Sequence, residues 1–125
     1  MNENRDKWLE RTELLLGREK LERLRRSRVL VVGLGGVGAY AAEMIARAGV
    51  GHMTVADADV VSESNINRQL IALHSTVGRP KTEVMAERLR DINPDIDLRT
   101  VARFIKDDET YALLDSDRFD YVVDA

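Results

Sequence analysis

Short runs rich in valine, leucine and isoleucine alternate along the chain with longer stretches in which apolar residues recur every three or four positions. The short runs predict strands over residues 28–32, 52–56, 96–101 and 119–123. The longer stretches predict helices over residues 36–48, 80–91 and 107–114. Strands joined by helices form right-handed βαβ units. We therefore expect an α/β fold with a Rossmann-like, doubly wound parallel sheet whose strands are ordered 3-2-1-4.

The helices are expected to bury their apolar faces against this sheet. The first sheet-covering helix places five apolar residues at helical spacing: Val37, Tyr40, Ala41, Met44 and Ile45. The next helix, opened by Pro80, has an apolar face of Val84, Met85 and Leu89. Met44, Met53 and Met85 are most simply interpreted as core residues.

Two helical segments precede the first strand. Residues 8–16 have helical apolar spacing that ends at Gly17, and residues 20–26 continue as a second, charged helix. We therefore divide the chain into a helical N-terminal arm, residues 1–27, and a sheet domain, residues 28–125. The arm carries adjacent apolar residues, Leu14 to Leu16, that it would expose unless a partner covered them. Its arginines alternate with glutamates, which favours a solvated face with i,i+4 ion pairs over an RNA-binding track.

Composition narrows the class of protein. The chain has 125 residues, 44% of them hydrophobic, which suits one globular unit. Its net charge is −3, whereas a protein that binds nucleic acid over its whole surface needs a positive charge. The absence of cysteine excludes disulfides and thiolate zinc sites within these residues. A polar N-terminus and no long apolar run argue against a membrane span or a secretory signal, so we expect a cytoplasmic protein.

The last predicted strand, residues 119–123, reaches the end of the sequence almost at once. In a sheet of this order that strand lies beside the first strand and normally leads on to further strands. A hydrophobic edge strand left unpaired is rare in natural folds. We therefore expect the sequence to be a fragment, truncated at its C-terminal end.

The segment VVGLGGVGAY, residues 31–40, joins the first strand to the helix that follows. Its glycines at 33, 35 and 38 match G-x-G-x-x-G, the fingerprint of dinucleotide-binding loops. Such glycines let the backbone turn tightly and approach a phosphate closely. Gly36 is an extra glycine where helix and ligand meet, so another nucleotide remains possible at this point. The loop alone does not decide between NAD and ATP.

Polar residues after the second predicted strand favour ATP over NAD as the bound nucleotide. Asp57 stands where a carboxylate holds a ribose, which NAD also requires. The loop that follows supplies amide and guanidinium donors from Asn65, Asn67, Arg68 and Gln69. Lys81 lies in the first turn of a helix, where its charge opposes the helix dipole unless an anion binds there. Arg68 and Lys81 can together neutralise a triphosphate. The alternative for this loop is a solvated segment in which Ser62 or Ser64 caps a turn.

These motifs resemble a known superfamily. G-L-G-G-V-G, D-A-D-V-V, S-N-I-N-R-Q and V-G-R-P-K are similar to segments of the ThiF/MoeB and ubiquitin-activating proteins, which use ATP to adenylate a carboxylate. Within that superfamily, the R-T-E-L-L-L-G segment, the N-I-N-R-Q-L-I-A-L loop and the helix K-T-E-V-M-A-E-R-L-R-D-I-N-P resemble the bacterial tRNA threonylcarbamoyladenosine dehydratases.

The resemblance implies adenylation of the carboxylate of threonylcarbamoyladenosine in tRNA, followed by cyclising dehydration with loss of AMP. ATP and Mg²⁺ are the implied cofactors, and the magnesium ligand is expected beyond Ala125, so these residues alone are expected to be inactive. The residues expected to bind the nucleotide are Gly33, Gly35, Gly36, Gly38, Asp57, Asp59, Asn65, Arg68, Gln69 and Lys81. The residues expected to act in catalysis are Arg11, Arg68 and Lys81.

The resemblance also implies partners. Arg11 matches an arginine that reaches the ATP of the other subunit in a homodimer. The expected substrate partner is tRNA, with a sulfur-transfer or accessory protein as a further partner. Two alternatives remain open. One is adenylation of the C-terminal glycine of a ubiquitin-like sulfur carrier, and the other is an NAD-binding module without chemistry.

Overall fold

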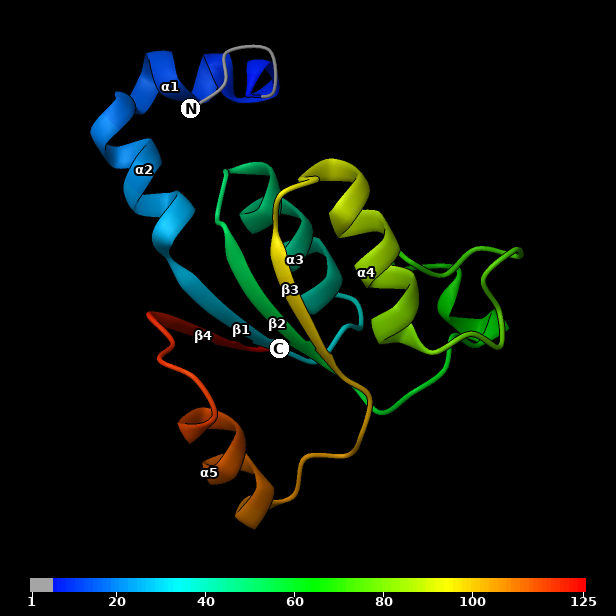
Figure 1. Cartoon of the computed structure of the whole chain (residues 1–125). Coiled ribbons are helices and arrows are strands. Elements are labelled where there is room, and N and C mark those ends of the chain that lie inside the picture. The colour runs from blue at the N-terminus through cyan, green and yellow to red at the C-terminus, as the bar shows by residue number, and fades with distance from the viewer. Residues whose placement is uncertain (1–5) are drawn as a thin grey trace.

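The computed structural model describes residues 6–125 and contains a four-stranded parallel sheet with the strand order β3-β2-β1-β4 (Figure 1). The strands are β1 (Arg28–Val32), β2 (His52–Ala56), β3 (Asp97–Val101) and β4 (Tyr121–Asp124). Val32, the last residue of β1, pairs with Ala56 of β2 and Asp124 of β4, so these strands end at one edge of the sheet. The predicted fold and strand order are confirmed.

The helices alternate with the strands. The sheet is preceded by the 3₁₀ turn η1 (Lys7–Leu9) and by α1 (Glu10–Leu16) and α2 (Arg18–Arg26). The connections within the sheet contain α3 (Gly38–Arg47), the short turn η2 (Glu63–Asn65), α4 (Lys81–Ile92) and α5 (Asp107–Asp115). Gly17 separates α1 from α2 with a φ of 85°, a conformation that favours glycine. Over residues 6–125, no helix combines the length and apolar character that a membrane crossing requires.

The sheet is covered on both faces. Val29 and Val31 of β1 pack into the larger core cluster with residues of α3 and α4. Leu30, which points to the opposite face, packs with Leu113 of α5. Figure 1 shows the corresponding layers, with α3 and α4 together on one side of the strands and α5 on the other. Burial on both faces explains why β1 reads as a continuous apolar run.

The face that α3 buries differs from the sequence prediction. Ala39, Ala42 and Ala46 are fully buried against the sheet, because small side chains let the helix lie close to it. Three of the predicted core residues are instead exposed, with exposed fractions of 71% for Val37, 46% for Tyr40 and 55% for Met44. The interpretation of Met44 as a core residue is therefore wrong, whereas Met53 and Met85 are buried as predicted.

Candidate nucleotide-binding site

The glycine loop follows β1 at the edge where the strands end. Gly33 has a φ of 93° and donates its amide to the carbonyl of Ala56 at 2.8 Å, which turns the chain away from the sheet. Gly38 begins α3, and a Cβ there would collide with the carbonyl oxygen of Gly33. The fold itself therefore requires glycine at both of these positions.

Gly36 has a different environment. Apart from its chain neighbours, no heavy atom of the described residues lies within 4 Å of the position that a Gly36 side chain would take. The fold gives no steric reason for glycine there, whereas close approach of a phosphate does. A Cβ on Gly35 would lie 3.7 Å from Nε2 of Gln69, so the Gln69 side chain lies next to the loop. Gln69 is buried, and its Oε1 has no hydrogen-bond partner among the described residues.

Asp57 follows β2, and its carboxylate links the glycine loop to the segment after β2 by hydrogen bonds. Its Oδ2 accepts a hydrogen bond of 2.8 Å from the amide of Leu34, inside the glycine loop. Its Oδ1 accepts a hydrogen bond of 2.7 Å from the amide of Asp59. Each carboxylate oxygen has two lone pairs, so both can also accept a hydrogen bond from a ribose hydroxyl. The half-buried carboxylate is thus fixed in orientation before a ligand binds.

Lys81 is a buried cation at the start of α4. The helix begins at this residue, with Pro80 as its N-cap, and the Lys81 amide donates to the carbonyl of Asp59 at 3.0 Å. Only 5% of Lys81 is exposed, and its Nζ lies 4.0 Å from Oδ2 of the exposed Asp59 side chain. At this distance from Asp59, the ammonium group of Lys81 still has N–H donors that can bind an anion. The site therefore combines a buried ammonium with a helix N-terminus, both of which favour an anion.

The polar loop between β2 and α4 forms many of its hydrogen bonds within itself. Oδ1 of Asn65 accepts a bond of 2.9 Å from the amide of Ser62. The exposed guanidinium of Arg68 donates to the carbonyl of Ser64 at 3.2 Å and to Oδ1 of Asn67 at 2.9 Å. Asn65 and Arg68 are therefore engaged locally, whereas Asp57, Asp59, Gln69 and Lys81 contact the glycine loop or each other.

Arg11 lies far from the glycine loop within one chain. It is an exposed residue of α1, a helix without buried residues, and Leu14 and Leu15 beside it are 82% and 83% exposed. Figure 1 shows α1 beyond the amino ends of the strands, whereas the glycine loop follows the carboxyl end of β1. Among the side chains that the structure describes, no cluster of three or more histidine, aspartate or glutamate residues could hold a metal ion.

Comparison with known proteins identifies close relatives. Residues 9–125 match the ThiF family. The chain is 48% identical over 115 residues to the tRNA threonylcarbamoyladenosine dehydratase of Bacillus subtilis, which covers 92% of this chain and 45% of that protein. It is 46% identical over 93 residues to the molybdopterin-synthase adenylyltransferase of Escherichia coli, covering 74% of this chain and 37% of that protein.

A solved structure has the same fold. The crystal structure of the Escherichia coli tRNA N6-threonylcarbamoyladenosine dehydratase in complex with ATP matches with a TM-score of 0.91 at 42% identity. The match covers 96% of this chain and 49% of that one, and the chain spans about half the length of the curated relatives it matches. A family match over nearly all of the sequence, at this identity and with this fold, shows that the chain belongs to the ThiF family.

Proposed function

We propose that the protein is an ATP-dependent enzyme that adenylates the carboxylate of threonylcarbamoyladenosine in tRNA and then closes a ring with loss of AMP. One observation carries this proposal. The glycine loop, Asp57 and the buried Lys81 gather at the carboxyl ends of β1 and β2, in a chain 48% identical to a protein named for this dehydration. A solved relative with a TM-score of 0.91 holds ATP, which supports the choice of nucleotide.

In this proposal, each part of the site binds one part of ATP. The amides of the glycine loop and the N-terminus of α3 bind phosphate, with Gly36 leaving room for its close approach. Asp57, oriented by Leu34 and Asp59, accepts hydrogen bonds from the ribose hydroxyls. Lys81 and Arg68 pair with the triphosphate. To do so, the exposed guanidinium of Arg68 gives up its hydrogen bonds to Ser64 and Asn67. The side-chain amide groups of Gln69 and Asn65 supply further hydrogen bonds to the nucleotide.

The reaction then needs two displacements. The substrate carboxylate attacks the α-phosphorus of ATP, pyrophosphate leaves, and a mixed anhydride with AMP forms. A nucleophilic atom of the same threonylcarbamoyl group attacks the activated carbonyl carbon, AMP leaves and the ring closes, with the net loss of one water from the nucleoside. Lys81 and Arg68 stabilise the negative charge that develops on the leaving pyrophosphate. Mg²⁺, when bound, supplies further positive charge to the triphosphate.

The proposal includes a homodimer. Arg11 cannot contact ATP in its own chain without a large movement of α1, but a second subunit could bring its arm to the site. The exposed Leu14 and Leu15 support this proposal, because contact with a partner would remove their apolar surface from water. A tRNA substrate is consistent with a cytoplasmic enzyme.

A second candidate function is adenylation of the C-terminal glycine of a ubiquitin-like sulfur carrier. The 46% identity to a molybdopterin-synthase adenylyltransferase favours it, and a sulfur-carrier protein would then be the partner. Both candidates require ATP and release pyrophosphate during adenylation. They differ in the carboxylate that is activated.

Nucleotide binding and acceptor choice test the proposal. Calorimetry on the full-length protein should show tighter binding of ATP than of NAD, and Lys81→Met should weaken ATP binding by about 1.5–3 kcal/mol, the range for a hydrogen bond to a charged group. AMP should form only when tRNA carrying threonylcarbamoyladenosine is added. Tighter binding of NAD would contradict the ATP site, and AMP formation with a diglycine-ended carrier instead of tRNA would favour the second candidate.

A further inference from the structure

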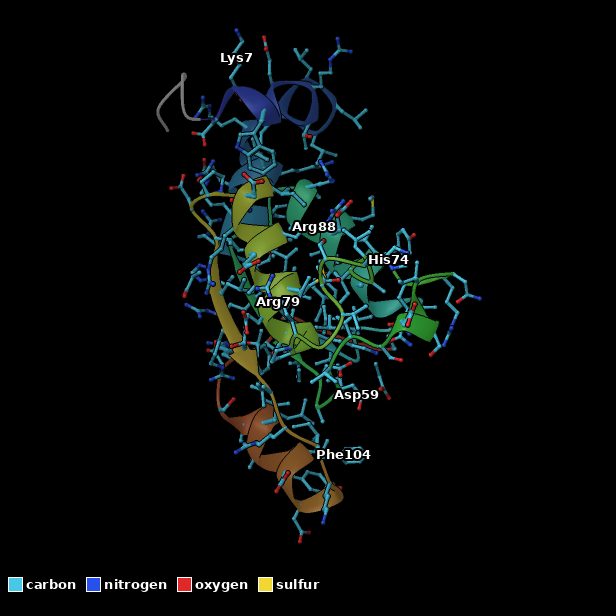
Figure 2. All side chains as sticks on the ribbon, turned by 90° about the vertical axis from the view of Figure 1, so that its right-hand side faces the viewer. Lys7, Asp59, His74, Arg79, Arg88 and Phe104 are labelled. Carbon is cyan, nitrogen blue, oxygen red and sulfur yellow. The ribbon has the colours of Figure 1, made fainter. Side chains whose placement is uncertain are left out.

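A second candidate binding surface lies at the opposite end of α3 and α4 from the glycine loop. A cavity of about 590 Å³ is lined there by Trp8, Arg47, Arg88, Asp91 and Ile92, and we call it the Trp8 pocket. Its residues come from η1, from the last turn of α3 and from the C-terminal half of α4. Figure 2 shows Arg88 between the ribbons of α3 and α4, below the arm that carries Lys7.

The two arginines of the Trp8 pocket are held by one buried carboxylate. Glu43, only 6% exposed, accepts a hydrogen bond of 3.2 Å from Nε of Arg47 and another from Nε of Arg88. These contacts lower the pKa of Glu43, with the hydrogen bond from Arg88 as the largest cause. Both arginines bind Glu43 through Nε, and no bond of their terminal nitrogens to another described residue is found. Two guanidinium groups are thus oriented, with donors remaining for a ligand.

Trp8 adds an aromatic surface. It is 39% exposed and lines the cavity together with the arginines. Proteins that bind single-stranded nucleic acid combine these two elements, because bases stack on aromatic rings while arginines pair with phosphates. An acidic protein segment would use the arginines, but it would have no particular need of the indole ring. The combination therefore favours RNA.

The position of the Trp8 pocket suits a substrate that also reaches the nucleotide site. Arg88 is seven residues after Lys81, which places both on one side of α4 at about 10 Å along the helix axis. On α3, the exposed Tyr40 and Met44 share a face with Arg47 and lead from the glycine loop toward the pocket. The nucleotide site and the Trp8 pocket therefore lie at opposite ends of the same two helices.

We propose that the Trp8 pocket binds a nucleotide of the tRNA substrate that flanks the modified adenosine, with its base on Trp8 and its phosphate on Arg47 and Arg88. This inference rests on the proposed function, since it assigns a binding site for the same tRNA. Asp91 also lines the pocket, and its carboxylate repels the bound phosphate. The pocket therefore binds RNA less tightly than its arginines alone would allow.

The experiment measures the affinity of the full-length protein for tRNA that carries threonylcarbamoyladenosine. Trp8→Ala and Arg88→Gln should each weaken binding by about fivefold or more, as loss of a stacked base or a phosphate contact does. Trp8→Phe should retain most of the affinity. Arg90→Gln is the matched control, because it removes the same charge from α4 at an exposed position outside the pocket, and it should change affinity less than about twofold.

Asp91→Asn makes the test independent of folding defects, because it should tighten tRNA binding by about twofold to threefold at low salt. If the wild-type protein processes the tRNA but these variants bind it like Arg90→Gln, the Trp8 pocket is not an RNA site and the proposed function stands. If the pocket variants weaken binding of a sulfur carrier and leave tRNA affinity unchanged, the RNA assignment is overturned. Failure of the wild-type protein to bind or process the tRNA overturns the proposed function itself.

Discussion

The amide of Leu34 donates a hydrogen bond of 2.8 Å to Oδ2 of Asp57, which ties the glycine loop to the end of the neighbouring strand. The other carboxylate oxygen holds the amide of Asp59 at 2.7 Å. Asp57 therefore orders the loops around the phosphates in addition to any contact with ribose. This second role separates it from a residue that serves only as a ribose ligand.

Asp57→Asn should weaken binding of inorganic triphosphate as well as ATP. The asparagine can accept from one of the two amides, but its NH₂ group would face the other donor. A loss of about 1.5–3 kcal/mol for both ligands is expected, because both hydrogen bonds involve a charged acceptor. Calorimetry with the two ligands checks this expectation. If the variant binds triphosphate normally and ATP weakly, Asp57 acts on the ribose alone.

Alanine substitutions at two glycines of the loop, Gly36 and Gly38, should have opposite effects on ATP binding and on folding stability. Gly36→Ala should leave the free energy of unfolding within about 0.5 kcal/mol of wild type, since open space surrounds the added methyl group. The same methyl group should lower ATP affinity at least about tenfold by occupying the phosphate position. Gly38→Ala is the contrasting variant and should destabilise the fold by about 1–3 kcal/mol, because its Cβ meets the backbone of Gly33. Normal ATP binding by Gly36→Ala would contradict the proposed position of the phosphate.

Arg11 should act in the site of the partner subunit. Arg11→Ala and Lys81→Ala proteins should each be weak enzymes. In a mixed dimer, the Arg11→Ala subunit keeps its own Lys81 and receives Arg11 from its partner, so one complete site forms. Mixing the two full-length variants should therefore restore up to half of the wild-type activity per mixed dimer. With subunit exchange verified, an activity equal to the average of the two parents would rule out this role.

Acid stability should depend on Glu43. Its pKa is lowered in the folded protein, so its contribution to stability is complete above its ordinary value of 4.5 and is lost as the pH falls through the lowered value. Glu43→Gln should make the free energy of unfolding depend less on pH below about 4.5. Urea unfolding at several pH values measures this dependence, with Glu13→Gln in the exposed arm as the control. An unchanged acid dependence would mean that the carboxylate is not held as the structure shows.

The sequence was sufficient to predict the features that depend on local patterns. The apolar run over residues 28–32 predicts a strand, which the structure contains as β1, and the glycine spacing predicts the loop that follows it. Both signals lie within a few adjacent residues. The sequence predicts that the last strand begins at Phe119. Phe119 instead packs with Leu113 of α5, before β4 begins at Tyr121.

The remaining features depend on contacts between distant segments. The spacing of apolar residues predicts that the large side chains of α3 lie in the core. The structure instead buries Ala39 and Ala42, because their small side chains let α3 pack closely on the sheet. The bond between Leu34 and Asp57 joins residues 23 positions apart, and it follows from the pairing of Val32 with Ala56. Similarly, Glu43 and Arg47 have i,i+4 spacing in the sequence, but Arg88 joins them only through the packing of α3 against α4.

The mass of the modified nucleoside after reaction tests the proposed function most directly. The full-length protein is incubated with ATP and tRNA carrying threonylcarbamoyladenosine, and the nucleosides are released and examined by mass spectrometry. We expect threonylcarbamoyladenosine to be replaced by a product lighter by one water, with one AMP formed for each conversion. An unchanged nucleoside, together with adenylation of a small diglycine-ended protein in a parallel reaction, would contradict the proposed function.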